Sequence, residues 1–193
     1  MKTTKIFTIA LVLITISLTT LSAQEKNSFK VDITNSTINW KGYKPMGSHH
    51  GTIELKWGNL TIEGEYITGS FVADMSTIKD ADGSKKLEGH LKSKDFFEIE
   101  VFATSKFEIL KTEMKDGKLH VTGNLTIKDV TKEITFPVII TKGDEMVTLT
   151  SETFQINRAD YKIQYKSKSF FNNLKEKFIN DKFDLQVSIV AKK

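Results

Sequence analysis

Cysteine is absent from the 193-residue sequence, and only two prolines are present. Without cysteine the chain can form no disulfide, so its stability has to come from packing. The missing thiol also excludes a cysteine nucleophile and a lipid-modified cysteine after a leader segment. The scarcity of proline and the absence of low-complexity stretches argue against a linker between domains. One domain is therefore expected.

Neither positive nor negative residues are in large excess. The sequence has 28 Lys and Arg against 24 Asp and Glu, a formal net charge of +4. No basic stripe stands out, so nucleic acid is not expected as a partner. The lysine-rich stretch 162–168 is best explained as a solvated loop.

Long apolar runs are absent except for residues 6–21, which follow two lysines and end near a small residue, Ala23. This order is typical of a secretory signal peptide. The run is short and rich in threonine for a membrane span, although an uncleaved anchor is the alternative. We predict a cleaved signal peptide over residues 1–23, a domain over residues 24–193, a periplasmic location and no stable membrane insertion of the mature chain.

The remaining sequence alternates polar and apolar residues, the pattern of strands with one buried face. The alternating runs cover residues 53–62, 71–75, 101–109, 119–127, 134–140 and 183–191. Turn signals divide them into eight to nine strands, which favours an antiparallel barrel or sandwich. The alternation changes phase across Gly58-Asn59, as expected at a turn or a bulge. The exception is residues 84–91, where Ser84 can cap a short helix that has Leu87 and Leu91 on one face.

Two phenylalanine doublets, 96–97 and 170–171, fall outside the regular runs. Neighbouring residues of a strand point to opposite faces, so a strand cannot bury both rings of a doublet in one core. We therefore expect both doublets to close the ends of the barrel.

Catalytic and metal-binding patterns are scarce. The four histidines lack the spacing of a zinc protease. A calcium loop that begins at Asp80 would need glycine at its sixth position and glutamate at its twelfth, where Lys85 and Leu91 stand. The sequence therefore predicts no metal site and no enzyme. Arg158 is unusual in a lysine-rich chain, because its planar fork suits a nearby acid such as Asp160 or an anionic head group.

Five segments together resemble the YceI-like family of exported, lipocalin-like lipid-binding proteins, in the version typical of Bacteroidetes-type bacteria. They read "INWKGYKPMGSHHGTIEL", "GSFVADMSTI", "LEGHLKSKDFF", "VTGNLTIKDVTKEITFP" and "NRADYKIQYKSKSFFNNL". The resemblance implies an all-β fold, an eight-stranded antiparallel lipocalin-like barrel with a short helix near one end. The chain departs from the family at Asp129, Lys162 and Lys166, where the family often has glycine.

The inward faces of the expected strands predict the binding residues. They are Phe71, Ala73, Met75, Phe107, Leu125, Ile127, Phe136, Phe183 and Leu185, with Phe97 and Phe170 near an end and Arg158 beside a head group. Small inward residues, namely Ala73, Ala103, Ser105 and Gly123, favour a hollow barrel over a filled one.

The expected function is periplasmic binding of a long-chain isoprenoid or related lipid of the quinone or polyprenyl type. Transport, storage and stress protection are all compatible with it. No cofactor is predicted other than such a bound lipid or quinone. The alternatives are a structural or interaction barrel with a filled core, and an enzyme acting on a lipid-like substrate. The oligomeric state stays open, and a homodimer is one of its alternatives.

Overall fold

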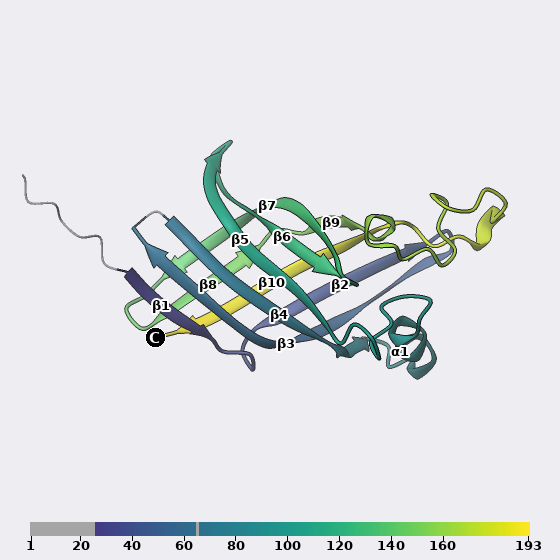
Figure 1. Ribbon diagram of the computed structural model, residues 1–193, viewed down its shortest axis with the longest axis horizontal. Helices are drawn as coiled ribbons and strands as arrows, with labels where there is room; N and C mark the ends of the chain where they lie inside the picture. Colours follow the sequence, from purple (N-terminus) through teal and green to yellow (C-terminus); the bar gives the residue numbers. More distant parts are fainter. Residues whose placement is uncertain (1–25, 65) are drawn as a thin grey trace, which may run out of the picture.

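A computed structural model describes residues 26–64 and 66–193 (Figure 1). The predicted signal peptide and its cleavage site lie outside the described residues. The strands are β1 (Lys26–Val31), β2 (Thr37–Lys44), β3 (Gly47–Glu63), β4 (Tyr66–Asp80), β5 (Thr104–Lys115), β6 (Lys118–Ile127), β7 (Val130–Lys142), β8 (Met146–Ser151), β9 (Phe154–Asn157) and β10 (Lys182–Lys192). The helices are α1 (Lys85–Lys92) and the short 3₁₀ helices η1 (Arg158–Tyr161) and η2 (Lys175–Lys177).

Eight antiparallel strands form a closed ring. Its order is β10-β2-β3-β4-β5-β6-β7-β8, and the pairing of β8 with β10 closes it. The two other strands extend this ring. β1 lies in line with β2 and pairs with β10 and β3. β9 lies in line with β8 and pairs with β10. The predicted eight-stranded antiparallel barrel is confirmed.

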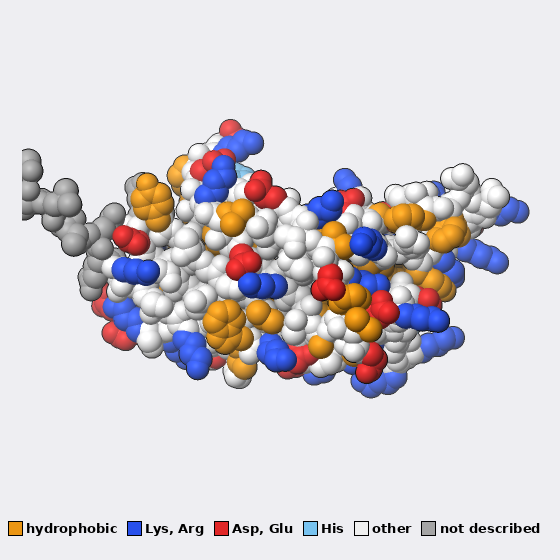
Figure 2. All heavy atoms as spheres, viewed as in Figure 1, with side chains coloured by type: hydrophobic (Ala, Val, Ile, Leu, Met, Phe, Trp, Pro, Cys, Tyr) orange, Lys and Arg blue, Asp and Glu red, His pale blue; other side chains and the backbone are white. Residues whose placement is uncertain are grey.

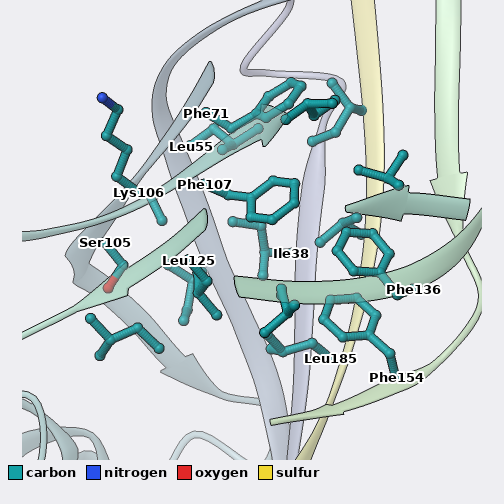
Figure 3. A pocket seen from close by; sticks show the side chains of 18 of the residues that line it. Ile38, Leu55, Phe71, Ser105, Lys106, Phe107, Leu125, Phe136, Phe154 and Leu185 are labelled. Atoms are coloured by element: carbon teal, nitrogen blue, oxygen red, sulfur yellow. The ribbon is translucent and has the colours of Figure 1, made fainter. Parts of the chain in front are cut away.

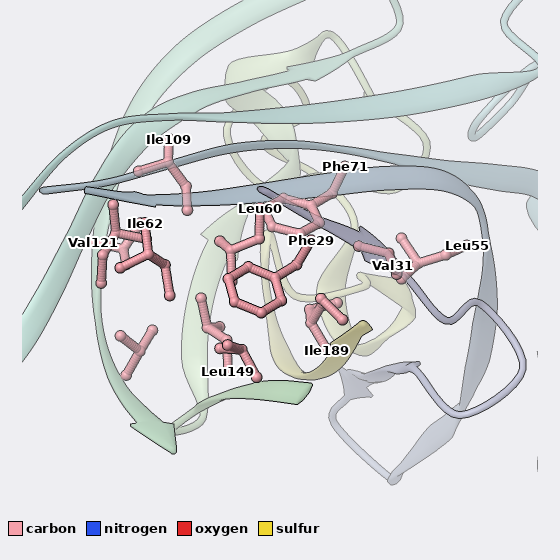
Figure 4. Packing of buried hydrophobic residues seen from close by; sticks show 14 of the residues in the cluster. Phe29, Val31, Leu55, Leu60, Ile62, Phe71, Ile109, Val121, Leu149 and Ile189 are labelled. Atoms are coloured by element: carbon pink, nitrogen blue, oxygen red, sulfur yellow. The ribbon is translucent and has the colours of Figure 1, made fainter. Parts of the chain in front are cut away.

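Strand alternation decides what the ring encloses. In β4, the buried residues Phe71, Ala73 and Met75 alternate with more exposed ones, and Ile78 is buried after a shift of one residue. One apolar cluster fills the β1 end of the barrel, where Phe29, Leu60 and their neighbours pack side by side (Figure 4). A second cluster lies toward α1 and includes Leu91 and Phe96. The interior is therefore apolar along its whole length.

Of the two alternatives for the change of phase near Gly58-Asn59, the turn is wrong and the bulge is confirmed, because β3 runs without a break from Gly47 to Glu63. The change of phase comes instead from irregular pairing with β4 between Leu55 and Trp57. A bulge of this kind moves the following side chains to the other face. Trp57 consequently lies outside, with 46 % of its surface exposed.

The strand predicted over residues 101–109 begins only at Thr104. Val101 and Phe102 instead donate backbone N–H groups to the carbonyl of Glu98, which has a positive φ of 50°. This turn leaves Ala103 exposed rather than inward. Gly123 does face inward, but the Phe107 ring occupies the space beside it, since a Cβ there would lie 2.5 Å from Phe107 Cζ.

The short helix begins as predicted. Ser84 is its N-cap, and the Ser84 hydroxyl accepts a hydrogen bond from the Leu87 N–H at 3.3 Å. The chain after α1 buries Phe96, whose ring packs edge-on against His90, with centroids 5.0 Å apart. The first phenylalanine doublet therefore closes this end of the barrel. In residues 26–64 and 66–193, no helix combines the length and the apolar character that crossing a membrane requires.

Candidate ligand-binding site

An apolar cavity of about 120 Å³ lies inside the barrel (Figure 3). We call it the barrel cavity. Its wall includes ten of the predicted residues, namely Phe71, Ala73, Met75, Phe97, Phe107, Leu125, Ile127, Phe136, Phe183 and Leu185. Strand parity places all of them except Phe97 inside, since Phe97 comes from the loop after α1. The small side chains of Ala73 and Ser105 leave room among larger ones.

Phenylalanine rings form one side of the barrel cavity. The rings of Phe136 and Phe154 are stacked at 4.1 Å between centroids with an interplanar angle of 6°. The Phe107 ring lies 5.4 Å from that of Phe136 and is tilted by 44°. Together the three rings form a rigid apolar surface suited to a long hydrocarbon chain.

Several lining residues were not predicted. They include Ile38, Ile53, Leu55, Ile134, Phe154 and Val187. The period-2 pattern could have identified most of them. Phe154 is the exception, because β9 has four residues and offers too short a run for its inward face to be recognised.

A second cavity of about 130 Å³ lies beside the first, toward α1. We call it the end cavity. The two cavities share four wall residues, Ile53, Phe97, Phe183 and Leu185. The end cavity also includes Trp40, Ile78, Leu87, Leu91, Phe96 and Ile163 in its wall, with Lys44 and His49 among its few polar residues. The two cavities are thus neighbouring compartments divided by a small set of side chains.

Arg158 borders the end cavity, but its guanidinium serves the protein itself. Nε, Nη1 and Nη2 donate to the carbonyl oxygens of Asn180, Ile163 and Ile179 at 3.0, 3.0 and 2.9 Å. Nη2 also lies 3.2 Å from Asp181 Oδ1. Burial lowers the pKa of Arg158, and the Asp181 carboxylate opposes that shift. The guanidinium therefore has a structural role, and a further role of Arg158 beside a ligand head group stays a prediction.

Phe170 lines neither cavity, in contrast to the prediction. It lies in the loop between η1 and β10, with 43 % of its surface exposed. A turn at Ser167 directs this part of the loop away from the barrel, because the Ser167 carbonyl accepts the N–H groups of both Phe170 and Phe171. The second doublet does not close the barrel.

The fold brings together three residues that the sequence spacing did not connect. Ligand atoms of His49, Asp80 and Asp82 lie within 4.8 Å of one another, and His49 Nδ1 is 3.5 Å from Asp80 Oδ1. Lys44 Nζ lies 3.3 Å from His49 Nε2. An ammonium group can only donate, so Nε2 accepts and Nδ1 carries its proton toward the buried carboxylate. Asp80 Oδ2 also accepts the Ser84 N–H at 3.1 Å, so His49 and Ser84 are polar neighbours of this carboxylate, and the absence of a required metal stays a prediction.

A family model described as YceI-like domain matches residues 29–191 of this chain. Among solved structures, that of Burkholderia cenocepacia BcnA matches with a TM-score of 0.69 at 17 % identity, covering 84 % of this chain and 99 % of that one. A polyisoprenoid binding domain from Saccharophagus degradans, described as implicated in plant cell wall breakdown, matches with a TM-score of 0.62 at 13 % identity, covering 85 % and 97 %. At these identities the two structures establish a shared fold. No curated protein sequence matches the chain.

Proposed function

The chain belongs to the YceI-like domain family, and from this premise we propose that it binds a long-chain apolar lipid of the isoprenoid or quinone type inside its barrel. The observation that carries the proposal is the pair of neighbouring apolar cavities along the barrel interior. A filled barrel of the same strands would need larger side chains at positions such as Ala73 and Ser105.

The cavity volumes suggest the size of the ligand. A water-sized group needs roughly 10–15 Å³ of such space, so each cavity holds on the order of ten groups and both hold about twenty. Burial of about twenty methylene groups contributes roughly 16 kcal/mol before the costs of ordering the chain are subtracted. A lipid of this length would therefore remain bound during purification.

The wall chemistry suggests what kind of recognition operates. In the barrel cavity, Ser105 and Lys106 are the polar lining residues, and Figure 3 shows the amine of Lys106 pointing away from the apolar side chains. Binding would therefore depend on the shape and length of the hydrocarbon chain. This pattern favours carrying or storing a lipid over chemical conversion of it, and the expectation that the protein is not an enzyme stays a prediction.

We also propose that the protein works in the periplasm, on the basis of the signal-peptide pattern in residues 1–23. Transport, storage and stress protection remain the roles compatible with a lipid carrier there. The assignment to a Bacteroidetes-type branch rests on the sequence segments alone and stays a prediction.

Ala73→Phe tests the proposal, because it fills the barrel cavity without adding charge. The variant should fold, as judged by circular dichroism, yet carry less lipid in an organic extract analysed by mass spectrometry. Ala103→Phe makes the same change at an exposed position and is the matched control. Wild-type protein that retains no lipid and binds no fluorescent lipid probe would instead support a filled, structural barrel.

A further inference from the structure

The second phenylalanine doublet is exposed on a loop at one end of the barrel. Phe170 and Phe171 expose 43 % and 47 % of their surfaces. We call residues 162–178 the basic tip. In Figure 1 this loop extends beyond the strands at the right of the view, and Figure 2 shows hydrophobic side chains there next to lysine or arginine. Grouped exposed apolar side chains of this kind mark a surface that contacts something else.

Hydrogen bonds hold the doublet in place. The N–H groups of Phe170 and Phe171 donate to the Ser167 carbonyl at 3.2 and 3.0 Å. The Ser169 hydroxyl donates to Asp181 Oδ2 at 2.7 Å, and Asp181 is in turn held by Arg158. The rings are therefore displayed by a defined turn, which lowers the entropy lost when they are buried against a partner.

The basic tip concentrates positive charge. It contains five lysines and one glutamate, a net charge of +4. Lys168 Nζ lies 3.5 Å from the centroid of the Phe178 ring, which keeps that lysine beside the apolar surface. Residues 24–193 as a whole have 26 basic and 24 acidic residues, so everything outside the tip carries a net charge of −2. A cationic end on an otherwise slightly acidic molecule favours an anionic partner.

The adjacent hairpin adds a third exposed apolar residue to this end. Met46, in the turn between β2 and β3, exposes 86 % of its surface. The hairpin is joined to the loop that follows the tip, because Asn180 N–H donates to the Tyr43 carbonyl at 2.9 Å. Lys44 and Asn180 also border the end cavity. The basic tip therefore lies at the end of the barrel where the end cavity is found.

We propose that the basic tip docks on the surface of an anionic lipid bilayer, with Phe170 and Phe171 in the interfacial layer and the lysines against the head groups. This inference rests on the proposed lipid-binding function, since docking places the end cavity next to a source of apolar chains. Phenylalanine and lysine are the residues that interfacial anchors combine. Each lysine near such a surface contributes about fivefold to binding.

Vesicle co-sedimentation tests the docking directly. Wild-type protein should bind phosphatidylcholine vesicles that contain about 30 % phosphatidylglycerol, and binding should fall strongly between about 0.05 M and 0.5 M salt. The double change Phe170→Ser with Phe171→Ser, and separately Lys175→Glu with Lys177→Glu, should each weaken binding about tenfold or more. Binding to pure phosphatidylcholine that equals binding to the anionic vesicles would overturn the proposal.

Matched controls separate the tip from the rest of the surface. Trp57→Ser removes an aromatic side chain of similar exposure from the barrel wall, and Lys26→Glu with Lys30→Glu reverses two charges on β1. Both should bind vesicles as wild type does. Equal loss in the control and tip variants would show nonspecific adsorption and overturn the assignment of the tip.

A second measurement distinguishes failure of docking from failure of lipid binding. The tip variants should retain co-purified lipid but transfer it to acceptor vesicles more slowly, whereas Ala73→Phe should bind vesicles normally and carry little lipid. Wild-type protein that retains lipid yet binds no anionic vesicle would refute docking and leave the proposed function standing. Capture of a protein or nucleic acid by the tip in place of vesicles would also refute it.

Discussion

Arg158 is the only arginine of the sequence, and it joins two stretches that are apart along the chain, residues 158–163 and 179–181. Its guanidinium contacts the carbonyl oxygens of Ile163, Ile179 and Asn180, and it is 4 % exposed. A guanidinium is needed because these acceptors lie in different directions and its N–H donors point in several directions at once. Without it, the loop that carries the basic tip would keep its backbone bond from Asn180 to Tyr43 but would lose its buried side-chain attachment to η1.

Arg158→Lys should lower the free energy of unfolding by about 2–4 kcal/mol, because one ammonium cannot reach all the buried acceptors. Urea denaturation of the variant and wild type measures the difference. Lys106→Ala, which breaks an exposed ion pair with Glu108, is the control and should cost under about 1 kcal/mol. Similar midpoints for Arg158→Lys and wild type would contradict the structural role.

Asp181 should make stability depend on acid pH. Burial raises the pKa of Asp181, but hydrogen bonds from Ser167 and Ser169, with the charge of Arg158, outweigh burial and lower it. A carboxyl whose folded pKa is lowered stabilises the fold above its unfolded pKa of about 3.9, and the stabilisation is lost as pH falls through the folded value.

Asp181→Asn should therefore be less stable than wild type near neutral pH, and the difference should shrink as the pH falls below about 4. Thermal melts across this range measure it. A difference that stays constant with pH would show that the charge of Asp181 contributes nothing.

At the scale of elements, two hairpins with the same geometry differ in sequence. The β5–β6 turn has Asp116 and Gly117 at φ values of 52° and 75°, and the β6–β7 turn has Lys128 and Asp129 at 49° and 60°. Two successive positive φ values in a two-residue loop are typical of a type I′ turn, which prefers glycine at its second position. Asp129 thus stands where the resemblance to the family also suggests glycine.

Asp129→Gly should raise stability by about 0.5–1 kcal/mol, which for a domain of this size is roughly 1–4 °C in melting temperature. The gain is partly offset by the greater freedom of glycine in the unfolded chain. The reverse change, Gly117→Asp in the neighbouring hairpin, should lower the melting temperature. If both changes shifted it in the same direction, the turn geometry would not be the cause.

At the scale of the whole molecule, the barrel interior is divided into two compartments. Phe97, from the loop after α1, is one of four side chains that both cavities share. It comes from outside the ring of strands, whereas Ile53, Phe183 and Leu185 come from β3 and β10. Truncation of the Phe97 side chain is thus the change that would join the two cavities with least disturbance to the barrel strands.

Phe97→Ala should cost up to about 3 kcal/mol of stability, because Phe97 is half-buried. It should also shift the preferred ligand toward longer chains. Displacement of a fluorescent probe by alcohols of increasing chain length measures this preference. Phe154→Ala, which enlarges the barrel cavity without touching the shared wall, is the control and should not show the shift. An unchanged length preference in Phe97→Ala would mean that the two cavities do not act in series.

Alternation and turn signals alone predicted six of the ten described strands, most of the hairpins, the capped helix and ten residues of the barrel cavity wall. Alternation is a local property, and it decides which side chains share a face wherever the strand stays regular. That is why Phe71, Met75, Phe107 and Phe136 could be placed inside before their partners were known.

The places where that local rule fails are set by contacts across the fold. The β3 bulge turned Trp57 outward, a turn at Glu98 removed Ala103 from the barrel, and Phe107 filled the space at Gly123. The acceptors of Arg158 lie up to 22 residues away, and Phe170 is directed outward by a loop that Arg158 and Asp181 fasten. These outcomes depend on which distant segments meet, because bulges, buried polar partners and loop directions are set by contacts across the fold and not by a residue's neighbours in the chain.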